Sequence, residues 1–267
     1  MISELDDCEG TLGITVLASG SAGNATLIHH GDKAILVDAG ISLKELKTRM
    51  KSCNLAPDIQ AVLVTHEHAD HVKGLRVIAN AFDVPIYTTR LCCEKLLEYD
   101  AKLRNIKIFM PGGEFDIAGV KVSPFSISHD AVDTVAFTFE CEGRKIGVAT
   151  DLGRPSQMVE FRLRDCDVML LESNHDLNLL AESTRPWQLK QRILGPIGHL
   201  SNRQFCELFP KVVSERTRTL LLGHVSRECN TYEVAEATAR CMLDAIHRED
   251  IRLKVARQDR PLETVWA

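Results

Sequence analysis

The sequence predicts an α/β protein folded as a four-layer αβ/βα sandwich. Short apolar runs alternate with segments of helical periodicity, and this strand-then-helix plan occurs twice along the 267 residues. Several of the apolar runs are closely followed by an aspartate or a histidine. No Pro- or Ser-rich linker, charge block or short-period repeat separates the halves, so we expect residues 1–267 to form a single domain with its site at the seam.

The first half is predicted to begin with three strands separated by glycine turns, over residues 14–18, 25–29 and 34–38. Residues 42–51 follow with apolar side chains at helical spacing, and Ser42 and Glu45 fit the two ends of a capping box. The rest of this half is predicted to contain, in order, a strand over 59–64, a helix over 72–82, a strand over 85–88 and a helix over 91–97.

The second half is predicted to open with a strand-rich block over residues 106–150. The elements expected after it are a strand over 167–172, a helix over 202–214, a strand over 219–223, a helix over 231–245 and a strand over 252–257. Only about two elements then fall between Asp151 and His224. We therefore expect no inserted cap domain, and a substrate held by loops.

Residues 65–71, which read Thr-His-Glu-His-Ala-Asp-His, directly follow the apolar run 59–64. Imidazole and carboxylate groups hold borderline divalent metals near neutral pH. His66 and His68 alternate along extended backbone and can serve one ion, while a helix starting at Asp70 and His71 would offer a second pair. The alternative is a chance cluster of structural histidines. It would require that no further ligands follow in the chain, but further candidate ligands do follow.

Residues 65–71 resemble the signature of the metallo-β-lactamase fold hydrolases. Four further motifs, one before this stretch and three after it, match the same family in chain order. The resemblance spans residues 13–224. It implies that Asp38 braces the metal loop and that Asp151 bridges two ions. The other implied ligands are, for one ion, His66, His68 and His129, and for the second, Asp70, His71 and His224.

Two divalent ions that share a carboxylate lie about 3.5–4 Å apart and lower the pKa of a shared water from about 16 toward about 7. The bridging hydroxide would then be the nucleophile, with Asp70 and Asp151 taking part in catalysis. Three-histidine sites suit zinc, while oxygen-rich bridged sites also accept manganese. The sequence therefore predicts two divalent ions, Zn or Mn.

Motifs at residues 19–24, 172–176, 198–202 and 224–230 resemble the YycJ/WalJ-type branch of that family. The branch consists of predicted DNA-acting phosphodiesterases, proposed as 5′→3′ exonucleases and distantly related to ribonuclease Z. One departure is present: the last motif of the branch ends in Glu-Asn-Asn, and here Cys229 replaces the first Asn.

Small polar residues in two of these motifs are candidate substrate contacts. Ser19, Ser21 and Asn24 lie among glycines that would let backbone N–H groups approach a phosphate closely, although a tight hairpin turn explains the same residues. Ser201 and Asn202 are the second pair, with helix capping as the alternative.

Two further histidines are candidates for supporting roles. His199, in a glycine-rich apolar loop, would protonate the leaving oxygen or bind the phosphate. His175, with Asp176, would orient a metal ligand, and the alternative is that Asn174 or Asp176 caps a helix.

Composition limits the possible partners. The net charge of −5 argues against a tight, non-specific DNA binder, whose affinity comes largely from Lys and Arg on phosphates. It argues less against an enzyme, because two bound cations would supply charge locally. The basic run 185–192 could supplement them, or could be a solvated helix start. Nine cysteines without a C-x-x-C spacing, an acidic stretch at residues 1–7 and no apolar run near about 18 residues predict a reducing cytoplasmic location without a membrane.

Three functions fit this set of residues. The leading one is a metal-dependent phosphodiesterase, a DNA exonuclease in preference to an RNA-acting enzyme. The same ligands would also serve a small-molecule hydrolase that cleaves a thioester, lactone or β-lactam. A non-catalytic scaffold with structural metals is the third, and it is disfavoured because all seven ligands are present.

Overall fold

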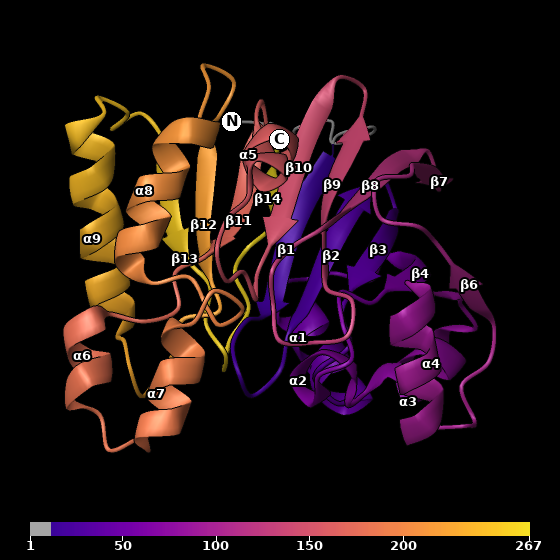
Figure 1. Cartoon of the computed structure of the whole chain (residues 1–267). Helices are drawn as coiled ribbons and strands as arrows, with labels where there is room; N and C mark the ends of the chain where they lie inside the picture. The colour runs from indigo at the N-terminus through magenta and orange to yellow at the C-terminus, as the bar shows by residue number, and fades with distance from the viewer. Residues whose placement is uncertain (1–11) are drawn as a thin grey trace.

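The computed structural model describes residues 12–267 as two seven-stranded sheets packed face to face, with helices on both outer faces (Figure 1). This is the predicted four-layer sandwich. The first sheet comprises, in spatial order, β14 (Val265–Trp266), β1 (Leu12–Ala18), β2 (Ala25–His30), β3 (Lys33–Val37), β4 (Asp58–Leu63), β5 (Ile86–Thr88) and β6 (Ile106–Ile108). The acidic stretch at residues 1–7, noted in the sequence, lies outside the described part of the chain.

The second sheet is the counterpart of the first, with its antiparallel strands at one side and its parallel strands at the other. Its strands, in spatial order, are β13 (Arg252–Val255), β12 (Thr219–Gly223), β11 (Val168–Glu172), β10 (Arg144–Ala149), β9 (Val135–Cys141), β8 (Val120–Ser126) and β7 (Phe115–Ile117). Every residue of β11 and β12 is buried, as expected for strands covered on both faces.

Helices of the first half cover the first sheet, and they are α1 (Leu43–Ser52), α2 (Ala69–Val72), α3 (Leu75–Phe82) and α4 (Arg90–Tyr99). The Ser42 hydroxyl accepts the backbone N–H of Glu45 at the start of α1, which confirms the predicted N-cap, while the Glu45 carboxylate pairs with Arg49 and does not complete the predicted capping box. The prediction of a single helix over 72–82 is wrong, because the helix is interrupted at Gly74 between α2 and α3. That residue donates its N–H to the Ala39 carbonyl at 2.7 Å, and a Cβ on it would lie 2.1 Å from the Ile41 carbonyl oxygen.

Helices of the second half are α5 (Gln157–Leu163), α6 (Leu177–Glu182), α7 (Trp187–Leu194), α8 (Asn202–Val212) and α9 (Tyr232–Ala245). The expectation of about two elements between Asp151 and His224 is wrong, since α5, β11, α6, α7 and α8 all precede β12. The missed helices have at most eight residues and bury only one or two side chains each, so their apolar periodicity is weak. In Figure 1, α6 and α7 lie side by side below α8 and α9.

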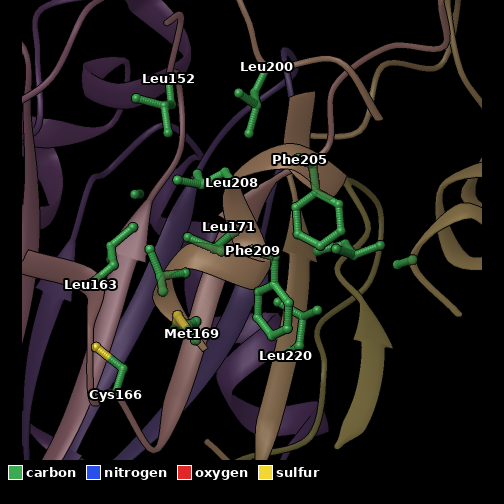
Figure 2. Packing of buried hydrophobic residues seen from close by; sticks show 14 of the residues in the cluster. Leu152, Leu163, Cys166, Met169, Leu171, Leu200, Phe205, Leu208, Phe209 and Leu220 are labelled. Carbon is green, nitrogen blue, oxygen red and sulfur yellow. The ribbon is translucent and has the colours of Figure 1, made fainter. Parts of the chain in front are cut away.

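Three apolar layers hold these elements together. One lies between the two sheets, a second between the first sheet and α1, α3 and α4, and a third between the second sheet and α5, α8 and α9. Figure 2 shows part of the third layer, where Phe205 and Phe209 of α8 lie with Met169, Leu171 and Leu220 of the strands beneath. The strand ends are thereby fixed as a rigid support for the loops that follow them.

The cysteines and the lengths of the helices can be described for residues 12–267 as a whole. Every cysteine from Cys53 onward is a free thiol. Within residues 12–267, none of the helices combines the length and apolar character needed to cross a bilayer.

Candidate metal centre

Six of the seven predicted ligands lie where parallel strands of the two sheets end, and His129 follows the antiparallel strand β8. His66 follows β4 beside Asp38 at the end of β3, while Asp151 follows β10 and His224 follows β12. Parallel neighbours place their carboxyl ends on one edge of a sheet. The two such edges meet here, so residues far apart in sequence converge on one place.

Three of these residues turn the chain sharply through the left-handed region. Asp38, Asp151 and His224 have φ angles of 60°, 54° and 51°. Non-glycine residues seldom adopt this conformation, and each instance costs about 1–3 kcal/mol unless the surroundings hold it in place. Strain at three residues of one centre is typical of a functional site.

The structure brings the predicted ligands into the predicted groups. His66, His68 and His129 form one cluster, with ring centroids between 4.6 and 5.2 Å apart. Asp70, His71 and His224 form another, in which Asp70 Oδ2 lies 3.4 Å from His71 Nε2 and 3.5 Å from His224 Nε2.

Asp151 lies between the two clusters. Its carboxylate is 3.1 Å from His71 Nε2, 3.4 Å from His224 Nε2 and 3.8 Å from His129 Nε2. The two oxygens face different partners, since Oδ2 approaches His71 and Oδ1 approaches His129 and His224. A carboxylate in this position can bridge two ions.

The donor set fits divalent metal ions. The ligand atoms His66 Nε2, His129 Nε2 and His224 Nε2 are buried without a hydrogen-bond partner among the described residues, and Asp151 Oδ2, although 3.1 Å from His71 Nε2, makes no hydrogen bond either. Leaving polar atoms in this condition is costly, so each of them points to a missing partner. Cations bound among these nitrogen and oxygen atoms would satisfy all four.

Burial and neighbouring charge have opposite effects on the pKa values of the ligands. Burial by itself would raise the pKa of Asp151, but the imidazoles of His224 and His71 hold it well below its usual range. Burial by itself would lower the pKa of His224, yet the Asp151 carboxylate raises it to about 10. For His66, burial and the adjacent His71 both lower the pKa well below the ordinary value. The carboxylate therefore stays ionised, as a cation site requires.

Asp38 connects the loop of residues 65–71 to the end of β3. Its Oδ1 accepts the Thr65 backbone N–H at 2.9 Å, and its Oδ2 lies 2.7 Å from His71 Nδ1. The second contact directs the opposite ring nitrogen of His71, Nε2, toward Asp70 and Asp151. One buried carboxylate thus orients both the loop and a ligand.

Glu172 supports the ligands His224 and Asp151 in a similar way to Asp38. The sequence did not predict this role for Glu172. Its Oε2 accepts the backbone N–H groups of Leu152 and Leu200, at 2.8 and 3.0 Å. Its Oε1 lies 2.8 Å from His199 Nδ1 and 3.1 Å from His224 Nδ1. Burial by itself would raise the pKa of Glu172, but these two imidazoles lower it to about 2. Its position at the end of a buried strand was the available signal.

The candidate loop of residues 19–24 is mostly a support for ligands. The Ser19 hydroxyl accepts the His224 backbone N–H at 2.8 Å, and Asn24 Nδ2 lies 3.0 Å from His71 Nε2 and 3.2 Å from Asp70 Oδ2. Both side chains are buried, whereas Ser21 is exposed beside His199. Of the three predicted substrate contacts, Ser21 alone is open to solvent.

The side chains of Ser201 and Asn202, predicted as substrate contacts, are buried in the fold. Ser201 is 1% exposed and caps α8 through a capping box with Gln204, while the Asn202 side chain is hydrogen-bonded to Ser173 and Asn230. Their polar atoms are therefore engaged within the fold. The capping alternative is the correct one for Ser201.

His175 is not placed against a ligand. Its ring is fully buried, both nitrogens lack a hydrogen-bond partner among the described residues, and burial lowers its pKa to about 4. The ligand-orienting contact predicted for it belongs to Glu172 instead. Asp176 caps α6, accepting the backbone N–H groups of Asn178 and Leu179.

Known proteins share both the sequence and the fold. A family model described as "Beta-lactamase superfamily domain" matches residues 33–224. This chain belongs to that family. Exodeoxyribonuclease YycJ of Bacillus anthracis is 32% identical over 236 residues, which cover 87% of this chain and 89% of that protein. Ribonuclease Z of Methanopyrus kandleri is 27% identical over 43% of this chain and 42% of its own length.

Among solved structures, the metallo-beta-lactamase fold protein YhfI from Bacillus subtilis matches 94% of this chain and 99% of its own length, with a TM-score of 0.71 and 17% identity. The predicted resemblance to metallo-β-lactamase fold hydrolases and to YycJ-type exonucleases is therefore confirmed. The chain is a metal-dependent hydrolase of this family, and its histidine and aspartate cluster implies divalent metal ions.

Proposed function

We propose that this chain is a two-metal phosphodiesterase that removes nucleotides from the ends of DNA. The observation that carries the proposal is the position of Asp151 between two complete ligand clusters. The first cluster, His66, His68 and His129, and the second, Asp70, His71 and His224, would each hold one ion. Zn or Mn suits this mixture of imidazole and carboxylate ligands.

Two divalent ions supply a water activated for attack and positive charge beside the scissile phosphate. The chain's own residues orient this centre. Asp38 directs His71, Glu172 directs His224, and Ser19 fixes the backbone that carries His224. These contacts hold the ligands in register before any substrate arrives.

His199 is the candidate proton donor to the leaving oxygen. Its Nδ1 is held by Glu172 at 2.8 Å, so Nε2 is the ring nitrogen left for a substrate. Burial by itself would lower the pKa of His199, but the Glu172 carboxylate raises it. A protonated imidazole beside the centre can deliver a proton as the bond breaks.

DNA is proposed as the substrate on the strength of the YycJ relative, whose match covers nearly the whole chain, whereas the ribonuclease Z match is shorter. We also propose that the chain forms a single domain. The DNA strand would be bound by loops and by the short helices α6 and α7.

The test is cleavage of end-labelled DNA and RNA, single- and double-stranded, by the purified chain loaded with Mn²⁺ or Zn²⁺. Processive loss of one labelled end from DNA, abolished in Asp151→Ala and retained in Asp244→Ala, an exposed aspartate of α9, is the expected result. Turnover of a lactone or thioester with no cleavage of any strand would instead support the small-molecule hydrolase.

A further inference from the structure

A pocket of about 140 Å³ adjoins the metal centre beside α7. His199 and Asn174 line it from the metal centre, while Arg185, just before α7, and Arg192, in its last turn, line it from the helix. His199 Nδ1 is 3.7 Å from Asp151 Oδ1. The pocket therefore opens next to the place where the reaction occurs.

The size of the pocket restricts its occupant. At about 140 Å³ it is smaller than most ligand sites. Sites for drug-sized ligands measure about 300–1,000 Å³. A space of this size suits a compact polar group such as a phosphate.

The pocket has two guanidinium groups with donors to spare. Arg185 Nη2 contacts Glu228 Oε1 at 3.1 Å, and its Nε is buried with no hydrogen-bond partner within residues 12–267. Arg192 Nε is bonded to Asp130, the one carboxylate of the lining. A guanidinium has five N–H donors, so both keep several free. The lining itself holds two guanidinium groups and one carboxylate, and Glu228 pairs with Arg185 from outside the lining.

Ser226 adds a hydroxyl donor. Its oxygen accepts the backbone N–H groups of Glu228 and Cys229, at 3.3 and 3.1 Å. Because both lone pairs are used, the hydroxyl proton is available to an acceptor in the pocket. The Asn174 amide is engaged elsewhere, since its Nδ2 donates to the His224 carbonyl at 2.8 Å. Guanidinium forks and a hydroxyl are the donors that bind phosphate oxygens best.

We propose that this pocket binds the terminal phosphate of a nucleic acid strand and thereby sets which bond is cut. The inference rests on the proposed phosphodiesterase function. A phosphomonoester carries a charge of about −1.5 to −2, more than a diester linkage within the strand, and so matches two arginines better. With the end held here, the next phosphodiester along the strand reaches Asp151 and its neighbouring ligands. The same chemistry fits a 5′- or a 3′-phosphate.

The experiment compares otherwise identical DNA strands that end in a 5′-phosphate, a 5′-hydroxyl or a 3′-phosphate. We expect a phosphate at one end to raise kcat/KM about 10- to 100-fold, the effect of one or two hydrogen bonds to a charged group. Arg185→Gln should abolish that preference, and Arg185→Lys should retain part of it. Arg203→Gln, which removes the same charge from an exposed position on α8, should leave it unchanged.

A second measurement does not depend on catalysis. Fluorescence anisotropy in the presence of EDTA should show tighter binding of the phosphorylated strand, and Arg185→Gln should remove the difference. Equal rates and equal binding for all three strands, or a preference that survives in both Arg185→Gln and Arg192→Gln, would overturn the inference. If no strand is cleaved, the phosphodiesterase proposal fails, and the binding measurement alone then decides for or against the pocket.

Discussion

The two sides of the metal centre are built in different ways. On one side, a single loop of residues 65–71 supplies four ligands, and the carboxylate of Asp38 holds it. On the other side, Asp151, His199 and His224 come from three separate segments, and Glu172 connects them. The first side is a local motif on one scaffold loop. The second exists only when β10, β11 and β12 are in register.

This difference predicts different weaknesses. A change within the loop should disturb the ligands it carries, whereas a change at the strand ends should disturb the geometry between segments. Asp151 belongs to both, because it contacts His71 of the loop and His224 of the separate side. Its replacement should have the largest effect.

Asp151→Asn keeps the shape of the side chain and removes its charge. We expect kcat to fall by at least about a thousandfold, since this group would join both ions and about 4 kcal/mol corresponds to that factor. Steady-state kinetics and metal content measured on the same sample test this. Near-normal turnover would show that the two clusters do not act as one centre.

Gly40→Ala should break the loop side. A Cβ at Gly40 would lie 1.6 Å from the Asp70 carbonyl oxygen, so the metal loop must move. A displacement of about 1 Å at the ligands should lower kcat about a hundredfold. Gly31→Ala is the control: no atom lies within 4 Å, and the strain that its φ of 60° imposes on alanine is confined to the turn between β2 and β3, so activity should be kept. Equal activity of the two variants would contradict the close approach.

Asp38→Asn and Glu172→Gln compare the two supporting carboxylates directly. Each should weaken metal affinity about 10- to 100-fold, because each orients a ligand imidazole. Glu172→Gln should also lower kcat at saturating metal, since Glu172 holds His199 as well. Chelator competition gives the affinities and kinetics the second effect. If saturating metal restores full turnover to Glu172→Gln, His199 does not depend on this contact.

The smallest effect concerns stability at acid pH in the first sheet. Burial lowers the pKa of His29 to about 4, from an ordinary value of 6.5, and its Nε2 contacts the Thr15 hydroxyl at 2.8 Å. The unfolded chain takes up this proton first, so the contribution to stability is complete above pH 6.5 and is lost as the pH falls toward 4.

The loss for His29 should reach on the order of 3 kcal/mol. Urea unfolding of wild type and His29→Leu at several pH values, with His30→Leu as the control, measures it. The His29→Leu protein should lose less stability on acidification than wild type. Parallel pH profiles for wild type and His29→Leu would show that this imidazole does not titrate as described.

The sequence was sufficient for the contiguous side of the centre and for the layers of the fold. Residues 65–71 lie side by side in the chain, and buried strands such as β11 have continuous apolar runs that can be recognised. It was not sufficient where tertiary packing decides the role. Glu172, the pocket between α7 and His199, and the burial of Ser201 and Asn202 all depend on segments that meet only in the folded chain.

The most direct test of the account is the number of metal ions bound by the purified chain, measured by mass spectrometry after loading and removal of excess metal. We expect about two ions per chain, about one in His68→Ala, which removes a ligand of a single cluster, and a loss at both clusters in Asp151→Asn. One ion in the wild-type chain, or two retained in Asp151→Asn, would contradict a two-metal centre bridged by Asp151.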